Sequence, residues 1–374
     1  MRTTLSLLTA AILVAVRSLD AQTFSSGSTG ADGALNITTD TTLPMPANGV
    51  FNFTTINVAG GATLRFSKNS LNTPVYLLAT GNVSIVGSID ISGSNANGGA
   101  AGVGGPGGFD GGTGGFGIGA STNGGDGLGP GGGPAGTYYD YGRSGVFSMA
   151  YQGNTRIYGN ALLSPLIGGS GGGGASGNPG YGGGGGGGAI LIASSTTITI
   201  AGSISANGGS GPGSYASFGS AGAIRLVAPV VGGSGSLYAQ SSTPGRIRID
   251  CTDRTSYRQL SYNGVASRGS QMFVFPAVQP RLSVIEAAGQ TIAEGTQNSV
   301  EVDLPAGSSQ NRTVKVRARD FTGTVPIRVV VTPENGASTT YDAQLDMSAG
   351  NPVDTSVDVV IPVGGISRIQ AWTR

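Results

Sequence analysis

Residues 177–208 read GNPGYGGGGGGGAILIASSTTITIAGSISANG, so seven consecutive glycines run without a break into a segment with the pattern of β-structure. Glycine loses more backbone entropy on ordering than any other residue, and a run of this kind is usually a flexible linker. The alternative is that its backbone is held by a regular neighbouring structure. The two interpretations predict different folds for most of the chain.

The glycines around this run keep a period of three residues. Every third position from 99 to 117 and from 168 to 186 is glycine, and the second series leads in phase into Ala189, where the strand pattern begins. A linker has no reason to keep a period, whereas polyproline II has three residues per turn and small residues let such chains approach closely. We therefore predict ordered polyglycine II-like tracts at 98–136 and 168–188. A disordered low-complexity loop is the alternative.

The strand pattern beside the tracts is repeated. Residues 75–93 (VYLLATGNVSIVGSIDISG) align without gaps to residues 190–208, and weaker copies follow at 222–228 and 245–250. Apolar residues or glycines alternate with polar ones, which is the period of a strand with one buried face. Short strand pairs that each need a neighbour to cover their apolar face are typical of solenoids or stacked sheets.

The glycine pattern then gives way to a different β-pattern. Residues 276–374 alternate at strand period in about seven segments, among them 282–285, 299–304 and 366–372, with turn residues between them. The sequence thus predicts an all-β chain with two parts. A repetitive β-solenoid-like or stacked-sheet domain over 22–275 carries the polyglycine II-like tracts, and an immunoglobulin-like β-sandwich follows over 276–374.

The N-terminus has the order of a secretory signal peptide. In MRTTLSLLTAAILVAVRSLDAQ, Arg2 precedes an apolar core and Ala21 offers a cleavage site, so we assign residues 1–21 to the signal, with a retained anchor as the alternative. No later stretch is long and apolar enough to span a membrane. We expect a secreted or cell-surface protein without a transmembrane span in its mature chain. The net charge of +1 predicts no nucleic-acid partner. The oligomeric state is open.

Catalytic groups are scarce. The chain has 70 glycines, 10% charged residues and no histidine, the commonest general base and transition-metal ligand. No calcium-binding Gly-Gly-x-Gly-x-Asp repeat is present. We expect no enzyme activity, no cofactor and no metal site. The alternative is a carbohydrate-active β-solenoid enzyme, a polysaccharide lyase or hydrolase. Its carboxylates would come from the scattered aspartates Asp40, Asp90, Asp110, Asp126 and Asp140, with the last three as the candidates.

An insert between the two tracts, residues 137–166, concentrates aromatic side chains. It holds five of the 12 tyrosines. Tyrosine offers a rigid aromatic surface with a polar tip, suited to stacking on sugar rings or to contact with a protein. The candidate ligand-binding residues are Tyr138, Tyr139, Tyr141, Arg143, Tyr151, Arg156 and Tyr158. The alternative is that the tyrosines only pack the insert against the glycine tracts.

Several elements occur in a characteristic order: TINVAGG, VYLLATGNVSIVGSIDISG, the GGGGGGGAILIAS junction, SAGAIRLVA and GRIRID. In these the chain resembles exported glycine-rich bacterial proteins with a β-repeat core, most of them uncharacterised. The tracts resemble polyglycine II assemblies of phage tail adhesins and insect antifreeze proteins. Neither group supplies a catalytic motif. We expect a secreted or cell-surface structural and adhesive protein that presents loops on a rigid scaffold to a glycan or a cell-surface protein. An ice-binding protein using the hydroxyls of Ser195, Thr196, Thr197 and Thr199 is a further alternative.

Overall fold

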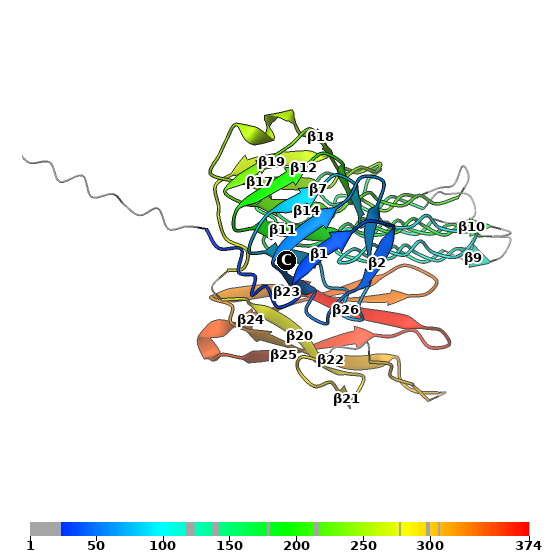
Figure 1. Cartoon of the computed structure of the whole chain (residues 1–374). Coiled ribbons are helices and arrows are strands. Elements are labelled where there is room, and N and C mark those ends of the chain that lie inside the picture. The colour runs from blue at the N-terminus through cyan, green and yellow to red at the C-terminus, as the bar shows by residue number, and fades with distance from the viewer. Residues whose placement is uncertain are drawn as a thin grey trace, which may run out of the picture.

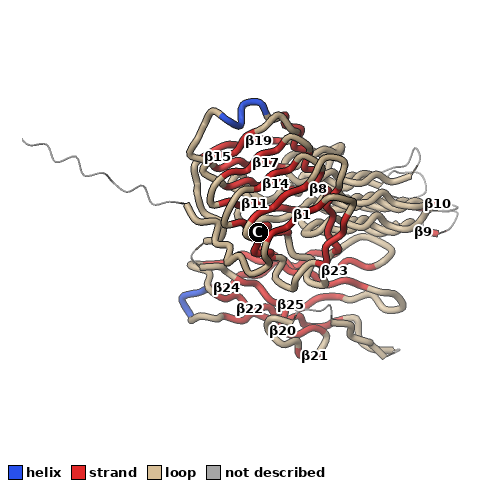
Figure 2. The backbone as a smooth tube through the Cα atoms, viewed as in Figure 1, coloured by secondary structure: helices blue, strands red, loops and turns tan. Residues whose placement is uncertain are grey.

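The structure, a computed structural model, describes residues 24–116, 124–136, 142–177, 180–212, 217–276, 278–296, 300–305 and 307–373. Within these residues the regular secondary structure is almost all β, with parallel and antiparallel sheets, two single 3-10 turns and no α-helix (Figures 1 and 2). The all-β prediction is confirmed. No helix in the described part of the chain is long and apolar enough to cross a membrane. The predicted signal peptide lies outside the described residues.

Three parallel sheets, here called A, B and C, are visited by the chain in turn. Sheet A holds β1 (Ala34–Ile37), β4 (Thr55–Val58), β7 (Val83–Ile85), β12 (Thr197–Ile200) and β15 (Val230–Gly232). Sheet B holds β2 (Thr41–Pro44), β5 (Thr63–Ser67), β8 (Ser88–Asp90), β13 (Ser203–Ser205), β16 (Ser236–Tyr238) and, after η1 (Ser256–Gln259), β18 (Ser261–Asn263). Sheet C holds β3 (Val50–Phe53), β6 (Val75–Ala79), β11 (Ala189–Ser194), β14 (Ala223–Val227), β17 (Arg246–Asp250) and β19 (Val265–Gly269). One strand from each sheet makes a coil, and consecutive coils stack.

The two copies of the sequence repeat form two neighbouring coils, and residues that are equivalent in the sequence alignment pair in the sheets. Val75 lies beside Ile190 in sheet C, Val83 beside Ile198 in sheet A, and Ile89 beside Ile204 in sheet B. Each pair is the pair that the gap-free alignment matches. Their inward side chains join one hydrophobic core that runs through the stack. Equivalent residues of the repeat therefore lie next to each other in adjacent coils.

The central strands of sheet C, β6, β11, β14 and β17, are buried on both faces. All six residues of β11 are buried, which explains the unbroken apolar run AILIA at a position where sheet A strands alternate. Its inner face belongs to the common core. Its outer face carries a second cluster formed with side chains from the insert and from a strap at residues 270–275, including Phe147, Leu163 and Phe275.

The glycine tracts leave the coils at one corner, between sheets B and C. Residues 91–188 connect β8 to β11, and residues 206–222 connect β13 to β14. The tracts run side by side away from the coils, and β9 (Gly115–Phe116) and β10 (Ser176–Gly177) pair near their far end (Figure 1). We call the packed segments the glycine bundle: residues 93–116, 124–136, 168–177, 180–188, 208–212 and 217–222.

The tract at 182–188 lies at the centre of the bundle. Its N–H groups donate to three neighbouring segments in rotation, so that Gly183 and Gly186 donate to Gly112 O and Phe109 O of one neighbour at 2.8 Å. Its carbonyl groups accept from three further segments; Gly105 N, for example, donates to Gly186 O at 3.0 Å. This backbone is hydrogen-bonded along its length, so it is an ordered part of the structure and not a free linker. Every third residue of the tract donates to the same neighbouring segment, and this spacing is the three-residue period of the glycines in the sequence.

The bundle has no room for side chains at its centre. A Cβ placed on Gly183 would lie 2.0 Å from Gly172 O, and one on Gly186 would lie 2.0 Å from Gly169 O. Real Cβ atoms do not approach a carbonyl so closely, and here the obstacle is backbone that cannot rotate away. Glycine is required at these positions for close approach, whatever its cost in entropy.

Residues 276–373 form two antiparallel sheets with a core of their own. Sheet D holds β21 (Gln290–Thr291), β20 (Arg281–Ala287), β22 (Asn311–Arg319) and β25 (Val353–Val360). Sheet E holds β24 (Thr339–Asp346), β23 (Thr324–Pro333) and β26 (Ser367–Thr373), and η2 (Met347–Ala349) follows β24. The strand predicted at 299–304 is wrong for residues 300–304, which lie in no strand. Leu304 packs against the core there without its backbone joining a sheet.

Candidate functional site

The insert lies over the outer face of sheet C, and its candidate residues have different environments. Tyr138, Tyr139 and Tyr141 lie outside the described residues. Tyr158 packs internally: its hydroxyl donates to Gly168 O at 2.6 Å and accepts from Ser170 Oγ at 3.0 Å. Its ring lies 4.7 Å from that of Phe147, and burial raises the pKa of its hydroxyl well above the ordinary value. Tyr158 therefore holds the insert onto the bundle.

The outer part of the insert, residues 149–162, carries several exposed apolar side chains among polar ones; we call it the insert tip. Four of the 13 exposed large hydrophobic side chains in the described part of the chain belong to it, namely Met149, Tyr151, Ile157 and Leu162. Tyr151 is 37% exposed and Ile157 is 56% exposed. Arg143 is also exposed, and its guanidinium donates to Gln152 O at 2.6 Å. Exposed apolar side chains gathered in a short segment are a common feature of interaction surfaces.

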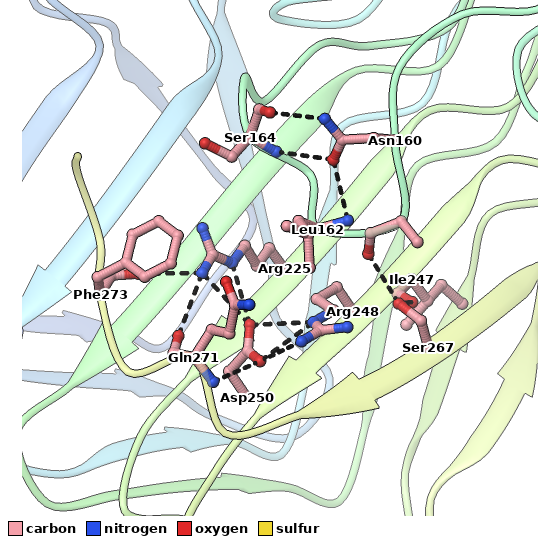
Figure 3. A network of polar contacts seen from close by, with 11 residues as sticks. Asn160, Leu162, Ser164, Arg225, Ile247, Arg248, Asp250, Ser267, Gln271 and Phe273 are labelled. Carbon is pink, nitrogen blue, oxygen red and sulfur yellow. Dashed lines mark hydrogen bonds and ion pairs between the residues drawn. The ribbon is translucent and has the colours of Figure 1, made fainter.

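The tip is anchored from below by a residue that the sequence analysis missed. Asn154 is 3% exposed, and its amide donates to Gly131 O, Gly132 O and Ser144 O at 3.0–3.2 Å. At the other end of the tip, Ser267 Oγ donates to Ala161 O at 2.9 Å (Figure 3). These contacts fix the base of the loop while its apolar side chains face outward. A lone Asn in a Gly-Asn-Thr turn gives no sequence signal of this role.

A second candidate site lies where sheet E meets the bundle. Its walls are Arg328, Val330, Thr332, Ser338, Thr340 and Trp372 from the sheet, Gly127, Gly129 and Pro130 from the bundle, and Arg156 from the insert. We call it the junction cleft. Arg156, a residue of the insert tip, is thus the candidate residue that the structure brings to a cleft. Tyr151 also lies in the tip, and Arg143 precedes the tip and donates to its backbone at Gln152 O. Trp372, the single tryptophan of the chain, had carried no functional prediction.

Two of the aspartates considered for catalysis fasten sheet E to the bundle. Asp126 is 4% exposed and accepts from Ala135 N at 2.7 Å and from Ser338 N at 2.8 Å. Asp110 binds Lys68 Nζ at 2.9 Å and lies 3.6 Å from Arg368 of β26. Burial raises the pKa of Asp110, but the charge and hydrogen bond of Lys68, the Gly104 N–H and the charge of Arg368 together lower it by more, so the pKa falls below the ordinary value. Asp140 lies outside the described residues.

Two further aspartates that were considered for catalysis, Asp40 and Asp90, meet on one arginine. Arg65 lies 3.3 Å from Asp40 and 3.7 Å from Asp90 on the exposed face of sheet B. The Thr63 N–H and the Arg65 guanidinium lower the pKa of Asp40. A glycosidase acid needs a raised pKa, so Asp40 lacks the electrostatics of a general acid. Among the described residues, no group of three or more His, Cys, Asp or Glu side chains is placed to hold a metal ion.

A buried ionic cluster fastens the strap that leads from the coils to the C-terminal sheets (Figure 3). Asp250 is fully buried and accepts from Arg248 at 2.7 Å, from Arg225 at 3.3 Å and from Gln271 N at 3.0 Å. Arg225 also donates to Phe273 O at 3.0 Å, and its guanidinium lies 4.7 Å from the Phe273 ring. The carboxylate of Asp250 accepts from both arginines and from the strap backbone, so the cluster joins the strap to sheet C.

The hydroxyls considered for ice binding do not form a regular array. Thr196 Oγ1 donates to Asn82 Oδ1 at 2.7 Å, and Ser195 Oγ donates to Ser26 Oγ at 3.2 Å. Thr199 is exposed on β12, but its neighbours in register are Ser84 and Gly232. A flat ladder of equivalent threonines is therefore absent from this part of the described chain.

Comparison with known proteins gives no relative for this chain: no family model, no curated protein and no solved structure matches it.

Proposed function

We propose that this is a secreted or cell-surface structural and adhesive protein. In this proposal the stacked coils are a β-solenoid, the glycine bundle is a polyglycine II-like assembly, and sheets D and E form an immunoglobulin-like sandwich. The observation that carries the proposal is the insert tip, an exposed apolar segment anchored on a bundle of backbone hydrogen bonds. A loop that is already held in place loses little conformational entropy when it binds a partner.

The electrostatics of the carboxylates support a role without catalysis. The pKa values of Asp40 and Asp110 are lowered, and both carboxylates are engaged by cations or backbone amides. Asp126 is held by two N–H groups. Groups used in this way fasten segments to each other. The partner that we propose for the tip is a cell-surface protein or glycan.

The test is a double substitution in the tip, Tyr151→Ala with Ile157→Ser, in the mature chain. If each side chain contributes about 1 kcal/mol to attachment, the pair weakens binding to cells or to a glycan array about 30-fold. Thermal stability should stay near that of the parent, since both side chains are exposed. Val86→Ser is the matched control, because Val86 is 50% exposed but belongs to the coils.

Attachment of the double variant at the parental level would overturn the role of the tip. The triple variant Tyr138→Ala, Tyr139→Ala and Tyr141→Ala extends the test to the rest of the insert. Lost attachment with unchanged melting supports binding by these tyrosines, and lowered melting with unchanged attachment assigns them to packing.

A further inference from the structure

We propose that the C-terminal end of the coil stack binds an acidic polysaccharide through three exposed arginines, Arg254, Arg258 and Arg268. We call these three residues the basic cap. The proposal deepens the adhesive function and rests on it only for the meeting with a polysaccharide at a cell surface. The surface itself is argued from the last coil and from the turn that covers it.

The hydrophobic core of the coil stack ends beneath one of these arginines. In sheet C, the inward row that includes Ile249 continues with Arg268 on β19. In sheet B, the inward row that includes Leu237 continues with Tyr262 on β18. The turn η1 adds Tyr257, which is 9% exposed. One charged and two aromatic side chains therefore lie where a further coil would place aliphatic ones.

Arg268 is held in place by these two rings. Its guanidinium carbon lies 4.9 Å from the ring centroid of Tyr257 and 5.1 Å from that of Tyr262. The Tyr262 hydroxyl donates to Tyr257 O at 2.8 Å, which fixes one tyrosine on the other. A guanidinium that lies over an aromatic ring keeps its N–H groups available as donors in its own plane. Because Arg268 is exposed, a ligand in solvent can reach these donors.

The other two arginines flank Tyr257 in sequence. Arg258 follows it directly within η1, and Arg254 lies in the turn before η1. Both are exposed. Among the described residues, neither side chain makes a hydrogen bond or an ion pair, and Arg268 makes no ion pair. The basic cap therefore presents three guanidinium groups that no carboxylate of the described chain neutralises by contact.

A single carboxylate, Asp253, lies beside the cap, and the adjacent turn occupies it. Asp253 accepts from the Ser256 hydroxyl, from Thr255 Oγ1 at 2.6 Å and from Thr255 N at 2.8 Å. These hydrogen bonds, with that of Ser256 the largest cause, lower the pKa of Asp253 to about 2. Its charge cancels one of the three positive charges of the cap and leaves two.

Positive charge is concentrated in this part of the chain. Residues 229–275 contain five arginines, no lysine and only two acidic residues, both aspartates, whereas the whole chain has a net charge of +1. A local excess of one sign attracts a polyion of the opposite sign even when the protein as a whole is nearly neutral. The partner that fits this surface is therefore an anionic polymer.

The chemistry of the cap favours an acidic polysaccharide over a nucleic acid. Guanidinium and carboxylate pair in a planar, two-pronged geometry, and a polymer with a carboxylate on successive sugars can engage several arginines at once. Proteins that bind single-stranded nucleic acid usually offer open aromatic faces for stacking, but the Tyr257 ring is buried beneath Arg268. The cap also adjoins the insert tip, since Ser267 Oγ donates to Ala161 O at 2.9 Å.

The first experiment measures binding of the mature protein to immobilised polygalacturonate, to its methyl ester, which has the same backbone without the charges, and to duplex DNA. We expect saturable binding to polygalacturonate that weakens between about 50 mM and about 300 mM NaCl, because salt screens exposed charges. Binding to the methyl ester should be at least about tenfold weaker. Equal binding to the ester, or tighter binding to DNA than to polygalacturonate, would overturn the proposal.

The second experiment uses the variant Arg254→Gln with Arg258→Gln. We expect a loss of about threefold in affinity for each exposed ion pair, and hence about tenfold for the two. Arg281→Gln with Lys315→Gln is the matched control, because it removes the same charge from sheet D. The control should bind like the parent. An equal loss in the control would show a response to net charge alone and would overturn the proposal.

Charged side chains at the end of a sheet can also serve to prevent edge-to-edge association. Sedimentation velocity of the double cap variant separates this role from binding. A variant that self-associates but keeps the parental affinity for polygalacturonate would assign the arginines to edge protection and exclude the binding role. The tip variant Tyr151→Ala with Ile157→Ser should bind polygalacturonate normally, so the cap and the tip can fail separately.

Discussion

Replacement of Gly186 by alanine should open the glycine bundle from its centre. The added Cβ would lie 2.0 Å from Gly169 O, whereas ordinary contact begins at 3.4 Å, so two tracts have to separate. The separation breaks the bonds between these two tracts, from Gly169 N to Gly187 O and from Gly172 N to Gly184 O, at about 1 kcal/mol each, and residual overpacking adds about 1–3 kcal/mol. We expect a loss of about 3–5 kcal/mol in the local free energy of opening.

The measurement is native-state hydrogen exchange over residues 168–188, with chemical denaturation as a second readout. Gly60→Ala is the matched control, because the nearest atom to its added Cβ is Val86 Cγ1 at 3.4 Å, an ordinary contact with a side chain. The control should change stability by less than about 0.5 kcal/mol. Exchange in the Gly186→Ala variant at parental rates would refute the packed arrangement of the tracts.

Three further predictions follow from buried and interfacial groups. Asp250→Asn leaves two buried guanidinium groups without their carboxylate and should destabilise the chain by about 3–5 kcal/mol in urea unfolding, and a loss below 1 kcal/mol would contradict the cluster's role. Tyr158→Phe should lower the free energy of unfolding by about 1–2 kcal/mol with attachment unaffected, whereas Tyr151→Ala should do the reverse. The pKa of Asp110 is lowered in the folded protein, so its carboxylate contributes fully to stability at a pH above 3.8, the ordinary pKa of an aspartate. This contribution to stability is lost as the pH falls through the lowered pKa. On acidification, the Asp110→Asn variant should therefore lose less hydrogen-exchange protection at Arg368 and its strand neighbours than the parent, and an equal loss in both proteins would exclude this group.

Local repetition made the coils and the glycine tracts readable from sequence. The gap-free match of residues 75–93 to 190–208 is the pairing register because stacked strands place equivalent residues side by side. The period of three in glycine was likewise informative, since each neighbour in the bundle is met every third residue. In both cases the spacing of residues in the sequence equals the spacing of the contacts that they make in the structure.

The candidate sites were less predictable because their partners are distant in sequence. Asp126 meets Ser338, 212 residues further on, and no periodic pattern joins them. Trp372 lies near the end of the chain and gains meaning from Arg156, a residue of the insert. Arg225 sits in a strand whose outer face would be solvated if the strap at 270–275 did not cover it. A segment that is distant in sequence can bury a strand face in this way, and the sequence of the strand itself gives no sign of it.

The central tract of the bundle, residues 182–188, is held by peptide groups and has no side chains, which should give it an unusual dependence on temperature. Unfolding a hydrophobic core raises the heat capacity, whereas exposure of polar surface lowers it. The central tract exposes mainly N–H and C=O groups on opening. We therefore expect its share of the heat-capacity change to be small, while the coil core keeps the usual large positive value. On cooling, the coils should lose hydrophobic stabilisation and the bundle should not, so the bundle should keep its rigidity in the cold.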